Sequence, residues 1–95
     1  MRLDASFKTN TICFVEDVLR IEAAQRADAE YIADVLAEYG ASVEPKGAVV
    51  IGTGMGSGTL LAAVLDALKA SLDANAIAAV KVSIDDQHYV MEGAP

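Results

Sequence analysis

The sequence predicts an α+β fold in which a small, mainly antiparallel sheet is covered by two or three helices. Residues 2–8 alternate polar and apolar side chains, which is typical of a half-buried strand. An apolar run at 48–51 and two apolar segments at 80–84 and 88–92 supply further strands. Between them, apolar residues recur at helical spacing. With 95 residues the chain has room for one domain, which we expect to span residues 1–95.

The first half of the chain is expected to be mostly helical after its opening strand. Residues 11–15 are β-branched and apolar enough for a second short strand. Residues 16–24 favour a helix, because oppositely charged side chains lie four residues apart. These pairs are Glu16 with Arg20 and Glu22 with Arg26.

A second helical segment is expected to begin at Asp28 as its N-cap and to end at Gly40. The junction at 24–27 holds no glycine or proline. One long helix is therefore the simpler prediction for both segments, with a helical hairpin as the alternative. The side chains expected on its buried face are Ile32, Val35, Leu36 and Tyr39.

The second half of the chain begins with a connector at 41–47, through which Pro45 prevents a helix from running. The run at 48–51 predicts a buried strand or an apolar lead into the loop that follows. A long helix is then expected from about Ser57 or Thr59 to Leu72, closed by Asn75. Its predicted buried face consists of Leu61, Val64, Leu65, Leu68 and Leu72.

The C-terminal segments at 80–84 and 88–92 predict a β-hairpin around the polar residues 85–87. Val80, Val82 and Ile84 alternate with polar residues and should share one face.

The loop at 52–58 has four glycines in seven residues and lies between a predicted strand and a predicted helix. A glycine-rich loop between a strand and a helix can bind an anion through free backbone N–H groups. The loop does not match the dinucleotide-binding motif G-x-G-x-x-G, because Ser57 or Thr59 stands where the third glycine is required. It also lacks the lysine of a Walker phosphate-binding loop. We expect a tight turn or a close helix–strand contact. Two alternatives stay open: a protein-binding loop with Met55 at its tip, and an anion- or small-ligand-binding loop formed by Gly52, Gly54, Gly56, Ser57 and Gly58.

The formal net charge of −7 disfavours nucleic acid and anionic membrane surfaces as partners. Residues 47–65 carry no charge and have the length of a membrane segment. The polar stripe of Asp66, Lys69 and Asp73 on the predicted helix argues against a transmembrane role for this segment. A lone Cys13 and an N-terminus without secretory features predict a cytoplasmic protein.

Glu30, Asp34 and Glu38 recur every four residues and are expected to form one acidic stripe along a helix. A solvated face is the simplest interpretation. The functional alternatives are a docking surface for a basic protein and an inhibitor surface that imitates nucleic-acid phosphates.

Residue types that carry catalysis are sparse. His88 is the only histidine and Cys13 has apolar neighbours, so we predict no catalytic residues, no metal site and no cofactor. The expected function is a non-enzymatic protein-interaction or regulatory module that contacts another protein through the acidic stripe or Met55. A small domain with an uncovered sheet edge also favours self-association as a homodimer.

The C-terminal half, with Gly54, Gly56, Ser57 and Gly58 followed by an alanine- and leucine-rich helix and the hairpin, resembles small bacterial effector-associated constant component proteins. The resemblance implies a compact, non-enzymatic partner encoded beside effectors in bacterial conflict systems.

Overall fold

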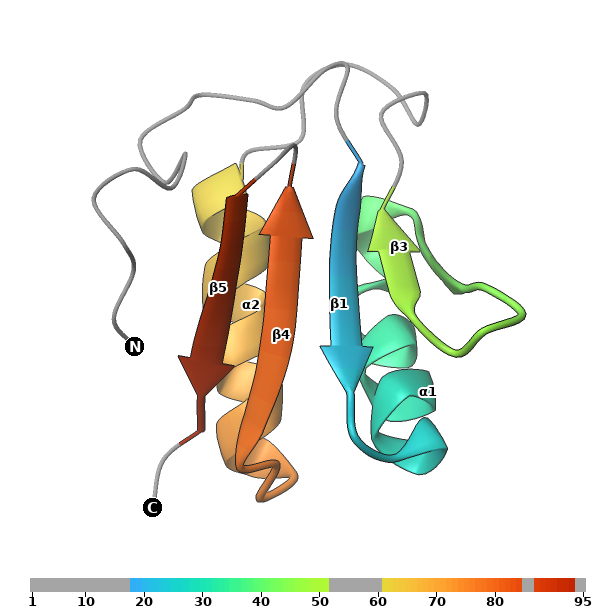
Figure 1. Ribbon diagram of the computed structural model, residues 1–95. Coiled ribbons are helices and arrows are strands. Elements are labelled where there is room, and N and C mark those ends of the chain that lie inside the picture. The colour runs from blue at the N-terminus through green and yellow to red at the C-terminus, as the bar shows by residue number, and fades with distance from the viewer. Residues whose placement is uncertain (1–17, 52–60, 85–86, 94–95) are drawn as a thin grey trace.

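A computed structural model describes residues 18–51, 61–84 and 87–93, which form one sheet with helices on one of its faces (Figure 1). The predicted α+β class is confirmed. In chain order the elements are β1 (Leu19–Ala23), α1 (Arg26–Val35), a 3-10 turn (Ala37–Tyr39), β2 (Ala41–Val43), β3 (Val49–Ile51), α2 (Leu61–Ala74), β4 (Ala79–Ile84) and β5 (Gln87–Glu92).

The strands lie in the order β2-β3-β1-β4-β5, and every neighbouring pair is antiparallel. β1 and β2, which α1 connects, therefore run parallel with β3 between them. β3 and β4, which α2 connects, run parallel with β1 between them. Two interleaved split β-α-β units of this kind make the ferredoxin-like arrangement, to which β5 adds an edge strand beside β4.

β1 corrects the prediction of a helix over 16–24 and of one long helix into the next segment. Leu19 and Ile21 are fully buried, since β1 lies between β3 and β4 in the middle of the sheet. Each such burial contributes about 1.5–3 kcal/mol. The charge pairs that favoured a helix contribute only about 0.2–0.5 kcal/mol each. The period-two alternation from Leu19 to Ala23 therefore decides the structure.

α1 begins after Gln25, which is its N-cap, and not at Asp28 as predicted. Asp28 instead lies in the first turn, where a carboxylate is stabilised by the positive end of the helix dipole. The predicted stop at Gly40 is confirmed. Gly40 has a φ of 84° and donates its backbone N–H to the carbonyl of Ala37 at 2.9 Å.

The face that α1 and its 3-10 turn present to the sheet differs at one position from the prediction. Ile32 and Leu36 are fully buried as expected, and Tyr39 packs partly buried against the core. Val35 is 37% exposed, so its predicted burial is wrong. It lies at the last residue of α1, before the chain tightens into the 3-10 turn.

The connector predicted at 41–47 contains the short strand β2, which pairs with β3. The turn between the two strands is closed by backbone hydrogen bonds. Gly47 donates to the carbonyl of Glu44 at 2.8 Å, and Glu44 donates to that of Ala48 at 2.9 Å. Gly47 has a φ of 97°, a left-handed conformation that glycine adopts without strain. The buried strand predicted at 48–51 is confirmed as β3.

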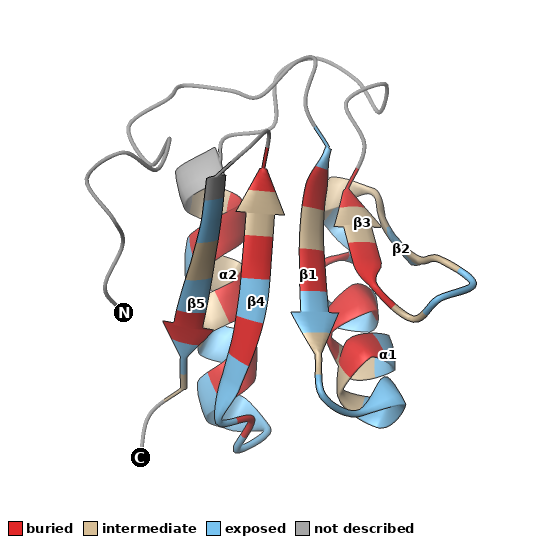
Figure 2. Cartoon of the chain, viewed as in Figure 1, coloured by how far each residue is buried: buried red, intermediate tan, exposed pale blue. Residues whose placement is uncertain are grey.

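The C-terminal half follows the sequence pattern closely. Val64, Leu65, Leu68 and Leu72 of α2 are buried as predicted. The hairpin of β4 and β5 is present, and Val80, Val82 and Ile84 share the face that contacts the core. Figure 2 shows buried residues alternating with exposed or intermediate ones along β4 and β1.

Several predictions concern segments outside the described residues. These are the strands at 2–8 and 11–15, Cys13, the start of the long helix at Ser57 or Thr59, and the hairpin tip at Asp85 and Asp86. Across residues 18–51, 61–84 and 87–93, no helix combines the length and apolarity needed to cross a membrane.

Candidate functional site

The acidic helix surface, defined here as Glu30, Asp34 and Glu38, is exposed at all three positions. Glu30 and Asp34 lie one turn apart on α1, and Glu38 lies in the 3-10 turn. Arg26 Nε approaches a carboxylate oxygen of Glu30 at 3.4 Å, with both side chains more than 60% exposed. Solvent screens such a pair strongly. Asp34 and Glu38 take part in none of the ion pairs between described side chains, so a single cation lies beside this surface.

Charge is segregated between the two layers of the described part of the chain. The helical layer carries six carboxylates against two cations, whereas the sheet and its turn carry three of each. The helical set is Asp28, Glu30, Asp34, Glu38, Asp66 and Asp73 with Arg26 and Lys69. The sheet set is Glu22, Glu44 and Glu92 with Arg20, Lys46 and Lys81. The negative excess of these residues thus belongs to the helices.

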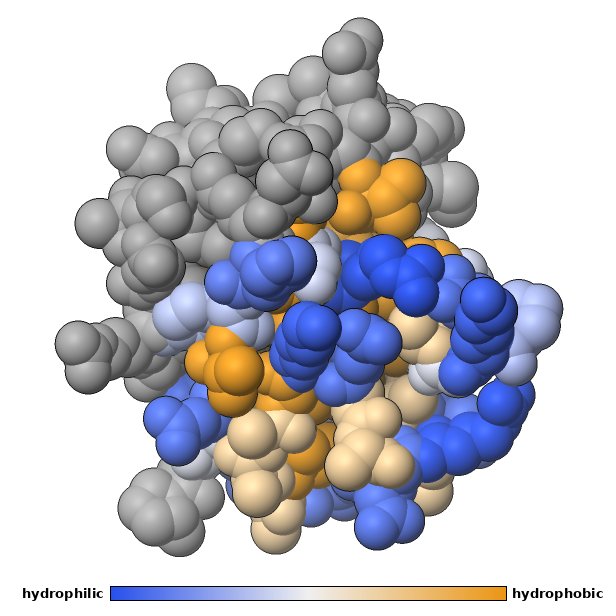
Figure 3. Space-filling model, viewed as in Figure 1, coloured by the Kyte–Doolittle hydropathy of each residue, from blue (hydrophilic) through white to orange (hydrophobic). Residues whose placement is uncertain are grey.

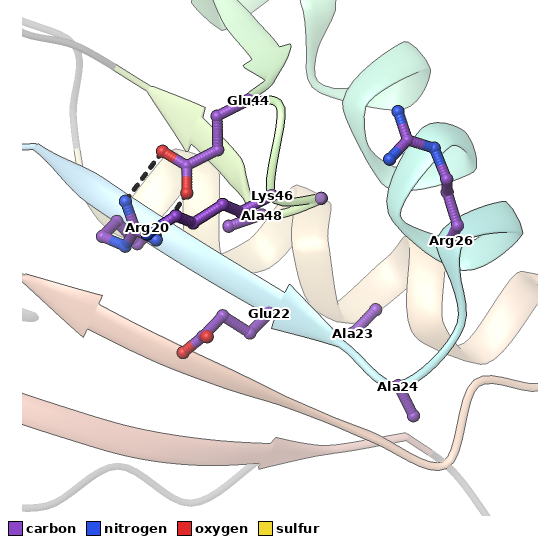
Figure 4. Close-up of a pocket in the computed structure, with 9 residues that line it drawn as sticks. Arg20, Glu22, Ala23, Ala24, Arg26, Glu44, Lys46 and Ala48 are labelled. Carbon is purple, nitrogen blue, oxygen red and sulfur yellow. Dashed lines mark hydrogen bonds and ion pairs between the residues drawn. The ribbon is translucent and has the colours of Figure 1, made fainter.

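A charged hollow of about 270 Å³ lies where the end of β1, the turn between β2 and β3, and the start of α1 meet (Figure 4). Arg20 and Glu44 form a bidentate ion pair on its wall, with nitrogen–oxygen distances of 2.6 and 2.8 Å. Glu22, Arg26 and Lys46 also line it. Arg20 thus pairs with a residue 24 positions away, whereas Glu16, its predicted partner, lies outside the described residues.

Hydrogen bonding dominates the electrostatics of this pair. The hydrogen bond from Arg20 lowers the pKa of the Glu44 carboxyl; partial burial opposes this shift, and the charges of Arg20 and Lys46 add to it. The same hydrogen bond raises the pKa of the Arg20 guanidinium above its ordinary value. A bidentate guanidinium–carboxylate contact fixes the turn between β2 and β3 against the centre of the sheet.

A lowered carboxyl pKa predicts how stability depends on pH. The pair stabilises the fold above the unfolded-state pKa of about 4.3, and this contribution is lost as pH falls through the lower folded-state pKa. Glu44→Gln should therefore lower the melting temperature at pH 7, and its difference from wild type should shrink steadily below about pH 4.

Thermal unfolding followed by circular dichroism between pH 2.5 and 7 checks this expectation. Glu38→Gln is the matched control, because Glu38 is exposed and has no ion pair within the described segments. A Glu44→Gln curve that stays parallel to wild type throughout would contradict a pH-dependent role for the pair.

The hollow holds no arrangement recognisable as catalytic. Its carboxylates are Glu44, which is occupied by Arg20, and Glu22 on the exposed side of β1. His88 lies on β5, opposite Ser83 of β4, and does not line the hollow. No group of three or more histidine, cysteine or carboxylate side chains that could hold a metal occurs among the residues described.

The structure separates the residues that the sequence analysis singled out. The acidic helix surface lies in the helical layer, whereas Gly52, Gly54, Met55, Gly56, Ser57 and Gly58 lie outside the described residues, between β3 and α2. The charged hollow is a feature that the sequence analysis missed. The alternation of apolar and polar residues in β1 was the available signal, since it places Arg20 and Glu22 on one side of a strand.

The face of the sheet opposite the helices carries mixed charge. Where coloured atoms are visible, Figure 3 shows hydrophilic side chains on this face with hydrophobic patches among them. Lys81 lies between Glu22 of β1 and Val90 of β5 in the cross-strand register. Neighbouring opposite charges of this kind compensate one another.

Comparison of the chain with protein-family models, curated proteins and solved structures gave no match.

Proposed function

We propose that this chain is a non-enzymatic protein-interaction or regulatory module that binds a basic protein through the acidic helix surface. The observation that carries the proposal is the segregation of charge among the described residues, where the helical layer holds the negative excess and the sheet residues are balanced. A surface with uncompensated charge steers an oppositely charged partner toward it and selects against acidic ones. The resemblance of the C-terminal half favours a partner from a bacterial conflict system.

Asp34 and Glu38 are the residues best suited to the test. Both are exposed, and neither takes part in an ion pair recorded between described side chains. Asp34→Lys with Glu38→Lys reverses the surface without removing a packed side chain. Glu22→Lys with Asp66→Lys is the matched control, because it changes the net charge equally at exposed sites on other surfaces.

Affinity capture from lysate of the source cells tests the proposal with tagged wild type and both double variants, washed at low and high salt. We expect one basic protein to be retained by wild type and by the control, and to be lost from the Asp34→Lys/Glu38→Lys variant. Equal retention by all three proteins, or no retained protein at all, would contradict the proposal.

An acidic inhibitor that mimics nucleic acid is the second candidate, and the same exposed carboxylates favour it. The captured partner distinguishes the two functions. A partner released by added duplex DNA or by RNA supports the mimic, since the two ligands would then share one basic site. A partner that stays bound supports a protein-specific interaction.

A further inference from the structure

β5 forms one edge of the sheet, and its backbone groups alternate in direction. Gly93 donates its N–H to the carbonyl of Ala78 at 2.7 Å, in the register that places Ala79 opposite Glu92. In an antiparallel ladder every second residue directs both backbone groups to the same neighbour. His88, Val90 and Glu92 therefore direct their N–H and C=O groups away from β4. In the described part of the chain, no strand pairs with that side.

This edge carries few of the features by which proteins block strand addition. β5 has six residues, against three for the opposite edge strand β2, and contains no proline or lysine. Val90, in its middle, is 59% exposed, the highest exposure among the large hydrophobic side chains recorded for the described residues. A long edge with an exposed apolar residue is a template for pairing with another strand.

We propose that β5 pairs antiparallel with β5 of a second copy of this chain, about a twofold axis that passes between the Val90 residues of the two copies. Val90 then lies opposite the partner's Val90. His88 lies opposite the partner's Glu92, and the reciprocal pair forms by symmetry. Either form of an imidazole carries an N–H that can donate to a carboxylate, so each pair joins a donor with an acceptor.

The chemistry of the strand selects this register over its neighbours. Across the two β5 strands, a side chain on one face of the sheet must pair with a side chain on the same face. The twofold axis can therefore move along the strand only in steps of one whole residue. An axis at Tyr89 would place His88 opposite the partner's Val90, and an axis at Met91 would place Val90 opposite the partner's Glu92. Both alternatives lose the histidine–carboxylate pairs. Opposite polar pairs and apolar pairs across strands each stabilise a sheet, so the Val90 register is favoured.

The Val90 register also suits the side chains of β5 that face the core. Tyr89 is partly buried and packs against the core, and Met91 is fully buried. In the dimer Tyr89 would lie on the same side of the joined sheet as the partner's Met91, so this register keeps the apolar core-facing side chains together. The two sheets would join into one continuous sheet with both helical layers on one face. The acidic helix surface is not used, so this inference stands apart from the proposed function.

Charge exchange at the two polar positions tests the dimer. His88→Glu places two carboxylates opposite each other twice per dimer, and we expect it to raise the dimer dissociation constant about tenfold. His88→Glu with Glu92→Lys restores opposite charges and should return the constant to near the wild-type value. Ser42→Glu is the matched control, because it adds the same charge at an exposed position on the far edge strand β2.

Sedimentation equilibrium over a range of protein concentrations measures the constant, and circular dichroism confirms that each variant is folded. A wild-type protein that stays monomeric would overturn the proposal. If the His88, Val90 and Glu92 amides of that monomer were protected from hydrogen exchange, the β5 edge would be paired with another segment of the same chain. A dimer that His88→Glu leaves unchanged, or that the double variant fails to restore, would overturn the register.

Discussion

Ile21→Ala is expected to lower the free energy of unfolding by about 3 kcal/mol. Ile21 is fully buried at the centre of β1, opposite Val49 of β3 and Val82 of β4. Removing its side chain leaves a cavity that strands on both sides prevent from collapsing. A typical domain is stable by only about 5–15 kcal/mol, so the variant should lose a large share of its stability.

Urea unfolding of wild type and variant at one protein concentration measures this loss. Val18→Ala is the matched control, because Val18 directly precedes β1 and is 48% exposed. It should change stability by less than about 0.5 kcal/mol. Similar losses of stability in both variants would contradict the assignment of residues 19–23 to a central strand. In a surface helix the two substitutions would differ much less in their effect on stability.

Gly93→Ala is expected to cost about 3 kcal/mol, although it adds a single methyl group. A Cβ at Gly93 would overlap the carbonyl oxygen of Ile77. That oxygen belongs to the backbone that connects α2 to β4, so it cannot turn away as a side chain would. The substitution should therefore separate the end of β5 from this connection and weaken the hydrogen bond from Gly93 to Ala78.

Gly47→Ala provides the comparison for this steric effect. A Cβ at Gly47 would meet only the end of the Arg26 side chain, at 3.9 Å, so the cost comes from its φ of 97°. A left-handed alanine costs about 1–2 kcal/mol. Urea unfolding should rank Gly93→Ala as the more destabilising variant. The reverse order would show that β5 does not approach the connection between α2 and β4 this closely.

The elements that the sequence predicts correctly are those whose local pattern and final burial agree. The apolar stripe of α2, the alternation in β4 and the glycine after the 3-10 turn each specify one structure. β1 was missed because two patterns compete in the same residues. Charge pairs at helical spacing favour a helix, and the alternation of Leu19 and Ile21 with polar residues favours a strand. Non-local pairing on both sides of β1 decides between them.

The candidate site was predictable only where local sequence pattern determines it, because the rest depends on contacts between distant segments. Exposure of Glu30, Asp34 and Glu38 follows from their spacing relative to the buried Ile32 and Leu36, and requires no knowledge of the sheet. The charged hollow depends on three segments that meet only in the folded sheet. The pairing of Arg20 with Glu44 could not be inferred while β1 was predicted to be helical.

Segregation of charge between layers has a physical consequence for binding. Mixed charges on the sheet compensate one another locally, so this face exerts little long-range attraction. The acidic helix surface adds the charges of three exposed carboxylates, and partner association with it should be fast at low salt and slower as salt rises.

The most direct test of the proposed function is calorimetric titration of the captured partner into wild type, the Asp34→Lys/Glu38→Lys variant and the Glu22→Lys/Asp66→Lys control, at two salt concentrations. We expect wild type and control to bind with similar affinity, and the acidic-surface variant to bind at least about a hundredfold more weakly, as expected for loss of charge complementarity at two positions. Equal affinity for all three proteins would contradict the claim that the acidic helix surface is the site of binding.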